Sequence, residues 1–254
     1  MSAVGRMERH NIRVGCAGWS IPRVHADRFA EGESHLARYA TRLSAVEIDS
    51  SFYRPHRPTT YARWADVTPD AFCFAVKAPR DVTHERRLVD TAEPLDRFVA
   101  EIGALGVKLG PMLVQLPPSL AFDPSVAAAF WQELRDRFRG EVICEPRHPS
   151  WFRRDADRLL QAWDVARVAA DPPPVPHADE PGGWVGLRYI RLHGSPRMYY
   201  DAYDGPYLEG LARRLAEYAQ HAPVWCVFDN TAAGAAILNA LRLLDLLYDR
   251  HVRP

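Results

Sequence analysis

Polar side chains capable of acid-base chemistry stand at the ends of short apolar runs in this sequence. Three pairs share a two-residue spacing: Glu47 with Asp49, Glu145 with Arg147, and Arg191 with His193. Residues two apart in a strand point to the same side of a sheet. We therefore expect each pair to face one way, where a carboxylate tuned by its neighbours, or an imidazole that titrates near neutral pH, can move protons.

The candidate catalytic group consists of acids and one histidine that follow apolar runs: Glu47, Asp49, Glu145, His193 and Asp229. The candidate substrate-binding group adds charge, amide and aromatic surface: Trp19, Tyr53, Lys77, His84, Gln115, Arg147, His148, Arg191 and Asn230. Basic side chains suit a phosphate or carboxylate, and aromatic rings stack on a sugar or a base. The two groups together indicate a small anionic or sugar-containing substrate.

Each of these residues also has a purely structural interpretation. Acids and bases at strand ends can pair with one another in an internal salt-bridge network that only specifies the fold. His84 and His148 fall in predicted loops, where an ordinary loop histidine is equally expected. The aromatic residues can equally anchor loops over the strand ends.

The same acids and histidines could offer oxygen and nitrogen ligands to a divalent metal. No H-x-x-x-H or comparably tight motif is present, so no metal ligands are assigned and no cofactor is predicted. The motifs G-x-S-x-G, G-x-x-x-x-G-K-[ST] and G-x-G-x-x-G are also missing. Their absence argues against a serine hydrolase of that type, a phosphate loop and a dinucleotide site.

The composition is that of a globular domain, with 254 residues of which 47% are hydrophobic and 25% charged. Thirty-two basic residues balance 32 acidic ones, which gives no global electrostatic case for nucleic acid or a membrane surface. No apolar run approaches the ~18 residues that span a bilayer, and no signal peptide is apparent, so we expect a cytoplasmic protein. The four cysteines lie singly in apolar runs and are expected to be buried reduced thiols.

Short apolar runs alternate with amphipathic segments along the chain. Strands are predicted at 12–16, 45–49, 72–77, 111–116, 141–145, 165–170, 187–193 and 224–229. Helices are predicted at 34–43, 59–65, 94–105, 123–138, 155–163, 207–220 and 232–248, from apolar stripes at helical spacing and from capping residues such as Ser34 and Asp123.

Eight strands with helices between most of them predict parallel pairing, because parallel strands need crossover connections. We therefore expect one domain over residues 1–254, an α/β TIM-type (β/α)8 barrel. One crossover, at about 171–186, is too rich in proline and glycine for a helix and should be an irregular loop. In such a barrel the strand ends converge on one mouth, where active sites lie.

The same segments resemble the YecE-like family, also called domain of unknown function 72, over a core of about 12–247. The resemblance is carried by GCAGWS (15–20), VEIDSSFYRP (46–55), TPDAFCFAVKAPRDVTH (68–84), LVQLPPS (113–119), CEPRHPSW (144–151), YIRLHG (189–194) and VFDNTAAGAAILNA (227–240). It implies a TIM-type barrel with these polar residues at one mouth, and it implies no particular reaction. The chain departs from many relatives after YIRLHG, where SPRMYYDAYDGPY stands in place of a glycine-rich loop.

Three functions follow from these patterns. The first is an enzyme, hydrolase-like or lyase-like, that uses carboxylate and histidine acid-base chemistry on a small substrate bearing phosphate, carboxylate or sugar. The second is a metal-dependent phosphoesterase-like enzyme. The third is a non-catalytic module that binds a nucleotide, nucleic acid or protein through its rim arginines and aromatics, although the neutral net charge disfavours extensive nucleic-acid contact.

Overall fold

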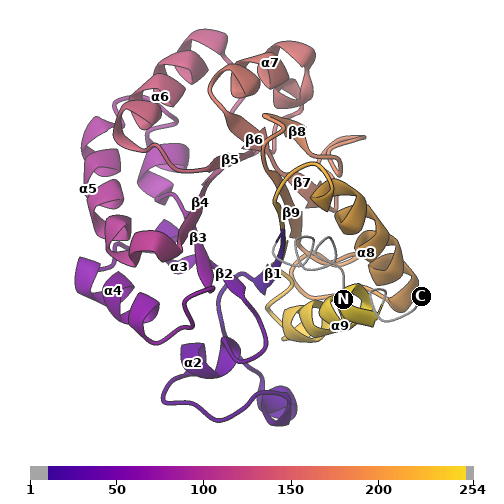
Figure 1. The fold of residues 1–254 in the computed structure, drawn as a ribbon. Helices are drawn as coiled ribbons and strands as arrows, with labels where there is room; N and C mark the ends of the chain where they lie inside the picture. Colours follow the sequence, from indigo (N-terminus) through magenta and orange to yellow (C-terminus); the bar gives the residue numbers. More distant parts are fainter. Residues whose placement is uncertain (1–10, 250–254) are drawn as a thin grey trace.

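Strands and helices alternate along residues 11–249, which are the residues that this computed structural model describes (Figure 1). The strands are β1 Ile12–Cys16, β2 Ala45–Ile48, β3 Cys73–Lys77, β4 Leu109–Gln115, β5 Val142–Glu145, β6 Val165–Arg167, β7 Ala169–Asp171, β8 Gly182–Gly183, β9 Arg188–Leu192 and β10 Val224–Phe228. The α-helices are α2 His35–Tyr39, α3 Ser50–Tyr53, α4 Pro58–Asp66, α5 Ala92–Ile102, α6 Pro124–Arg137, α7 Arg154–Ala162, α8 Gly205–Ala219 and α9 Ala235–Asp249.

Shorter helical turns connect several of these elements. They are η1 Arg23–Arg28, η2 Asp81–Glu85, η3 Gly103–Lys108 and η4 Pro149–Phe152. Of these, η2 is a single π-helical turn directly after β3. Such turns often mark functional positions in proteins.

The strands form two sheets whose main pairings are parallel. One sheet has the order β2-β3-β4-β5-β6-β8 and the other the order β1-β10-β9-β7, with only the two-residue β8 antiparallel among the described strands. The sheets meet beside β1 and β2 at an isolated parallel bridge between Ala17 and Glu47. Helices surround the strands on the outside (Figure 1). The mixed α/β architecture with parallel strands is thus as predicted.

The predicted strand 165–170 needs correction, because it is two strands. Residues of β6 pair with β5, and Val168 donates its N–H to Cys144 O at 2.9 Å. From Ala169 onward the chain pairs with β9 instead. The switch of partner at Val168 divides the hydrogen bonding into two sheets, and the chain itself links them there.

The predicted irregular crossover is confirmed in the described structure, where residues 172–187 contain no helix. Its only regular part is β8, which pairs with β6. Five prolines and three glycines lie within residues 172–186, and they explain why this stretch forms no helix.

Helix starts follow the predicted capping chemistry. The Ser34 side chain accepts the N–H of Ala37 at the start of α2, and Asp123 accepts two N–H groups at the start of α6. Helix α2 ends at Tyr39, earlier than predicted. The Tyr39 hydroxyl accepts the Cys16 N–H and donates to Ala45 O, both at 2.9 Å, and so fixes this end of the helix to β1 and β2.

Two apolar cores form, one on each side of the strands. The larger lies between strands and helices. The smaller is built from side chains at alternate strand positions and packs between the sheets: Ala45, Ala75, Leu113, Ile143, Ala166, Val168, Leu187, Tyr189, Trp225 and Val227. The polar residues described below lie directly above this inner core. All four cysteines are free thiols, and three of them are buried.

Among the helices of residues 11–249, none combines the length and the apolar character required to cross a membrane.

Candidate functional site

A polar layer lies directly above the inner apolar core. Each of its members comes two residues after a core residue on the same strand, so strand alternation points both side chains inward. The correspondence covers six strands: Ala45 with Glu47, Ala75 with Lys77, Leu113 with Gln115, Ile143 with Glu145, Tyr189 with Arg191, and Val227 with Asp229. The polar residues at the strand ends therefore form one continuous polar layer above the inner core.

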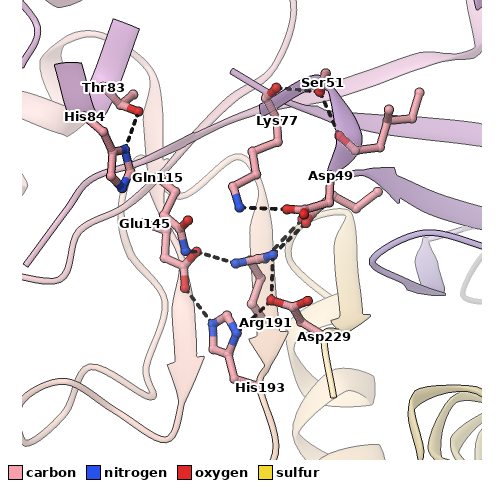
Figure 2. A network of polar contacts seen from close by, with 12 residues as sticks. Asp49, Ser51, Lys77, Thr83, His84, Gln115, Glu145, Arg191, His193 and Asp229 are labelled. Atoms are coloured by element: carbon pink, nitrogen blue, oxygen red, sulfur yellow. Dashed lines mark hydrogen bonds and ion pairs between the residues drawn. The ribbon is translucent and has the colours of Figure 1, made fainter. Parts of the chain in front are cut away.

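Arg191 is the centre of this layer, and it is completely buried. Its guanidinium makes a two-point contact with Glu47, at 2.7 and 3.1 Å. It also donates to Glu145 Oε2 at 2.6 Å and to Asp229 Oδ2 at 3.1 Å. The Tyr189 hydroxyl also donates a hydrogen bond to Glu47 Oε2, at 2.9 Å. One cation thus holds three carboxylates from the ends of three strands, and Figure 2 shows it with Glu145 and Asp229.

His193 is also fully buried and joins two of the same carboxylates. Its Nδ1 lies 3.0 Å from Asp229 Oδ2, and its Nε2 lies 2.8 Å from Glu145 Oε1. Arg147 contacts the same Nε2 and the same Glu145 oxygen, at 2.8 and 2.7 Å. Imidazole and guanidinium therefore form a second bridge between Glu145 and Asp229.

These contacts move the pKa values of the carboxyl groups apart. Burial alone would raise the pKa of Glu145, but Arg147, Arg191 and His193 outweigh burial and hold it well below its usual value. Burial likewise opposes ionisation of Asp229, and Arg191 with the His193 hydrogen bond lowers its pKa. At Glu47 burial prevails over Arg191, and the pKa is raised. Glu145 and Asp229 are therefore anionic at neutral pH.

A pocket of about 450 Å³ opens beside Asp229. Its lining comes from the loops and strand ends after β2, β3, β4, β9 and β10: Asp49, Phe52, Tyr53, Lys77, Arg80, His84, Gln115, Tyr199, Asp229, Thr231 and Ala232. Asp229 belongs both to the Arg191 cluster and to the pocket wall, and its side chain is 15% exposed. Gln115 also reaches both, because it donates to Glu145 Oε2 at 3.0 Å.

Lys77 and Asp49 form the opposite side of this pocket. They make an ion pair of 2.7 Å in which Asp49 remains 28% exposed. The Lys77 ammonium also lies over the Phe52 ring, 4.3 Å from its centroid, which adds a cation–π contact. A substrate in the pocket would thus meet an ammonium and two carboxylates.

His84 reaches the pocket from the π-helical turn η2. Its Nδ1 lies 2.8 Å from the Thr83 hydroxyl (Figure 2), and its ring packs against Phe52. Burial and then the charges of Lys77, Arg80 and Arg87 lower the pKa of His84. The ring is therefore neutral at neutral pH and able to donate or accept a hydrogen bond.

The structure brings most of the predicted site residues together but not all of them. Tyr53 stands at the rim and is 71% exposed. Trp19 lies in a neighbouring hollow. His148 is not among the lining residues of the pocket, and it accepts the Ser150 N–H at the start of η4. Asn230 is buried and holds the chain, since it donates to Asp201 O and to Asn239 Oδ1 at 2.9 Å each.

Three lining residues with functional groups were outside the two candidate groups, although Tyr199 is one of the aromatic residues that follow predicted strand ends. Arg80 follows β3 by three residues, and its position in a charged loop carried no distinguishing pattern. Tyr199 packs edge-on to His193, with ring centroids 5.8 Å apart, from the loop after β9. Thr231 follows Asn230. These residues could have been placed in the pocket only by knowing the direction in which each loop residue points. Strand alternation gives no such direction beyond the end of a strand.

No cluster of three or more His, Cys, Asp and Glu side chains within residues 11–249 is arranged to hold a metal ion. The physical reason is that Arg191 and Lys77 already occupy the carboxylates concerned.

The fold and the pocket define an α/β protein with parallel strands whose polar side chains meet at the carboxyl ends. Comparison with solved structures agrees, because a xylanase, CbXyn10B, is similar with a TM-score of 0.55 at 10% identity, over 96% of this chain and 99% of the xylanase. The fold of this xylanase is TIM-barrel-like.

The chain belongs to the YecE-like family, described as "Protein of unknown function DUF72", whose model matches residues 13–254. It is 26% identical to the UPF0759 protein YunF of Bacillus subtilis (strain 168), over 93% of this chain and 94% of that protein. A DUF72 family protein from Thermotoga maritima has a similar structure, with a TM-score of 0.78 at 24% identity, over 93% of this chain and 99% of the other. The predicted family is therefore confirmed.

Proposed function

We propose that this protein is an enzyme that performs acid-base chemistry on a small substrate bearing an anionic group and hydroxyl groups. The observation that carries the proposal is the position of Asp229. It is an ionised carboxylate on the pocket wall, and two fully buried groups, Arg191 and His193, hold it in one orientation. A carboxylate that is fixed from behind and open in front has the geometry of a general base, and the lowered pKa of Asp229 keeps it ionised and able to accept a proton.

The contacts of Asp229 support one of its two oxygens as the atom that meets the substrate. Arg191 and His193 both contact Oδ2, so Oδ1 is the atom that we expect to meet the substrate. When Oδ1 takes a proton, the negative charge that Arg191 and His193 stabilise is lost. His193 also contacts Glu145, so the hydrogen bonds of the cluster can readjust without exposing a charge to solvent.

Lys77 is the proposed partner of Asp229 across the pocket. It is buried, and Asp49 keeps it in place through the 2.7 Å ion pair. Lys77 and the rim residue Arg80 would hold a phosphate or carboxylate, with Gln115 and His84 hydrogen-bonding to hydroxyl groups. In this arrangement Glu47, Glu145 and Arg147 are positioning residues, because they contact the cluster and not the pocket.

The reaction class that we favour is hydrolysis or elimination, since both begin when a base removes a proton from water or from carbon. The metal-dependent phosphoesterase has no observation in its favour, because the carboxylates are engaged by Arg191 and Lys77. A non-catalytic binding module is kept as an outcome of the test below.

We extend the proposal to the finer fold and the location. A closed (β/α)8 barrel, in one domain over 1–254, is supported by the bridge at Ala17 and Glu47 and by the continuous chain at Val168. The four free thiols are compatible with a reducing compartment, so the cytoplasm and a small-molecule partner remain part of the proposal.

The Asp229→Asn variant tests the proposed base. A library of sugar phosphates, sugar acids and small hydroxy acids would first be screened for turnover by the wild-type protein. We expect Asp229→Asn to lower kcat about 10²–10⁴-fold on any substrate found, because asparagine keeps the shape and cannot accept the proton.

Asp245→Asn is the matched control, since Asp245 is exposed on α9, and it should leave kcat unchanged. Full turnover by Asp229→Asn would contradict the assignment. Saturable binding by the wild-type protein with no turnover of any bound compound would favour the binding module.

A further inference from the structure

A second hollow of about 490 Å³ lies next to the pocket and shares Asp49 with it. Its wall includes Trp19 from the loop after β1, Ser50, Arg54 and His56 from the segment after β2, and Trp64 from α4. The pocket is lined mainly by charged and hydrogen-bonding groups, whereas this hollow has an aromatic wall. We refer to it as the aromatic hollow.

The aromatic wall is rigid. Trp19 and Trp64 meet edge to face, with ring centroids 5.0 Å apart at 72°. The His56 ring packs on Trp64 at 5.1 Å, and the fully buried Tyr61 supports both from behind, at 5.3 Å from Trp64 and 5.8 Å from His56. Four interlocked rings have few alternative rotamers, so a ligand would lose little free energy in ordering them.

Neutral hydrogen-bonding groups border the aromatic rings. The Ser50 hydroxyl lies 2.8 Å from His56 Nε2. Burial and then the charge of Arg54 lower the pKa of His56, so its ring is neutral at neutral pH. Asp49 adds a carboxylate at the boundary with the pocket, where Lys77 engages its Oδ1.

This combination matches the two surfaces of a sugar ring. The C–H face of a pyranose packs on aromatic rings, and its hydroxyl groups need donors and acceptors around the edge. Indole rings flanked by a hydroxyl, an imidazole and a carboxylate supply both. Ser50 bonds His56 and Asp49 bonds Lys77, so a purely apolar ligand would leave the remaining hydrogen-bonding capacity of these groups unused, which is costly in a partly buried site.

We propose that the aromatic hollow is a binding subsite for a sugar ring, and that the substrate extends from it past Asp49 into the pocket. The inference rests on the proposed function for the second half of this statement, because the pocket supplies Lys77 and Asp229. The substrate class is therefore a glycoside or sugar ester whose second, anionic part reaches the pocket.

The test uses the full chain labelled with ¹⁵N, and the indole N–H resonances of its tryptophans. The Trp19 and Trp64 resonances are assigned by their disappearance in Trp19→Phe and Trp64→Phe. Methyl glycosides of hexoses and pentoses are titrated as neutral probes, with adenosine as a flat probe that is not a pyranose. We expect saturable shifts of the Trp19 and Trp64 resonances with at least one methyl glycoside.

Variants of Trp19 sharpen the test. Trp19→Ala should weaken binding of that glycoside about tenfold, because it removes one stacking ring, and Trp19→Phe should restore most of the affinity. Asp229→Asn should bind it like the wild-type protein. The titration of the wild-type protein needs no variant, so the inference stays testable if Trp19→Ala does not fold.

Shifts with adenosine alone, or no shift of either resonance with any glycoside, would overturn the subsite. If the hollow fails and Asp229→Asn still abolishes turnover, the proposed function stands with a smaller substrate. If glycosides bind the hollow and Asp229→Asn retains full turnover, the subsite stands and the proposed base is wrong.

Discussion

Two regions of the strand-end layer contain the same kinds of side chain in opposite situations. Around Arg191, three carboxylates and a histidine are bound to one another, and Glu47, Glu145 and His193 have no exposed surface. Around Lys77, a lysine and an aspartate make one ion pair on a pocket wall, where Asp49 is 28% exposed. Figure 2 shows the two regions next to each other, with Lys77 and Asp49 on one side of Arg191, and His193 and Asp229 on the other.

A charged residue at a strand end therefore does not by itself indicate a reactive site. In the Arg191 cluster every oxygen of Glu145 and Glu47 already has a donor, which leaves no atom for a substrate. Under the proposed function, the Arg191 cluster is the buried support and the Lys77 side is the reactive surface. Asp229 is the residue at which the support acts on the surface.

The largest expected change in the free energy of unfolding comes from the loss of Arg191, and it tests the contrast between the two regions. Arg191→Met should lower the free energy of unfolding by about 3–5 kcal/mol, because Glu47 and Asp229 lose their guanidinium partner and Glu145 keeps only that of Arg147. Lys77→Met should cost only about 1 kcal/mol, since Asp49 can be rehydrated from the pocket. Urea unfolding of the two variants measures both values. Equal losses would show that the two regions do not differ as described.

The next effect concerns acid stability. The pKa values of Glu145 and Asp229 are lower in the folded protein than in the unfolded chain, whose values are near 4.5 and 3.8. As pH falls, the unfolded chain therefore takes up protons first, and stability present above pH about 4.5 is lost through the folded-state pKa values. Each group contributes a slope of up to about 1.4 kcal/mol per pH unit.

Glutamine at position 145 separates this contribution from the others. Glu145→Gln should lower stability at pH 7 and flatten its decline below pH 4.5, as measured by urea unfolding at a series of pH values. Glu47 acts in the opposite direction, because burial raises its pKa, so Glu47→Gln should steepen the decline. An unchanged slope in Glu145→Gln would mean that Glu145 is not the acid-sensitive group.

The smallest effect belongs to the pocket wall. His84→Gln should raise KM about fivefold and leave kcat and stability nearly unchanged, because it alters one neutral hydrogen bond to substrate, worth about 1 kcal/mol. The matched control is His148→Gln, since His148 lies outside the pocket lining. A similar rise in KM for both variants would remove His84 from the substrate contacts.

Much of the fold was predictable because local patterns decide it. Short apolar runs, apolar stripes at helical spacing and capping residues such as Ser34 and Asp123 located nearly all strands and helices. The partner switch at Val168 was not predictable, because both sides of it are equally apolar and strand-like. Which neighbour each half hydrogen-bonds is decided by strands far away in sequence.

The same-side pairs were also predictable. Arg147 does contact Glu145, and Arg191 and His193 share the same two carboxylates. His148 and Asn230 show the limit of this reasoning. Both follow strand ends as the pocket residues do, yet one starts a helical turn and the other braces a loop.

The family is recognisable from sequence motifs. The strand-end positions of the polar residues and the side toward which each points also follow from the sequence alone, because alternation along a strand is a property of the local backbone. Only the tertiary structure decided which charges are buried with one another and which face a pocket. That division depends on how the loops after different strands cover the layer, and loop packing is a balance of contacts between segments that are distant in sequence.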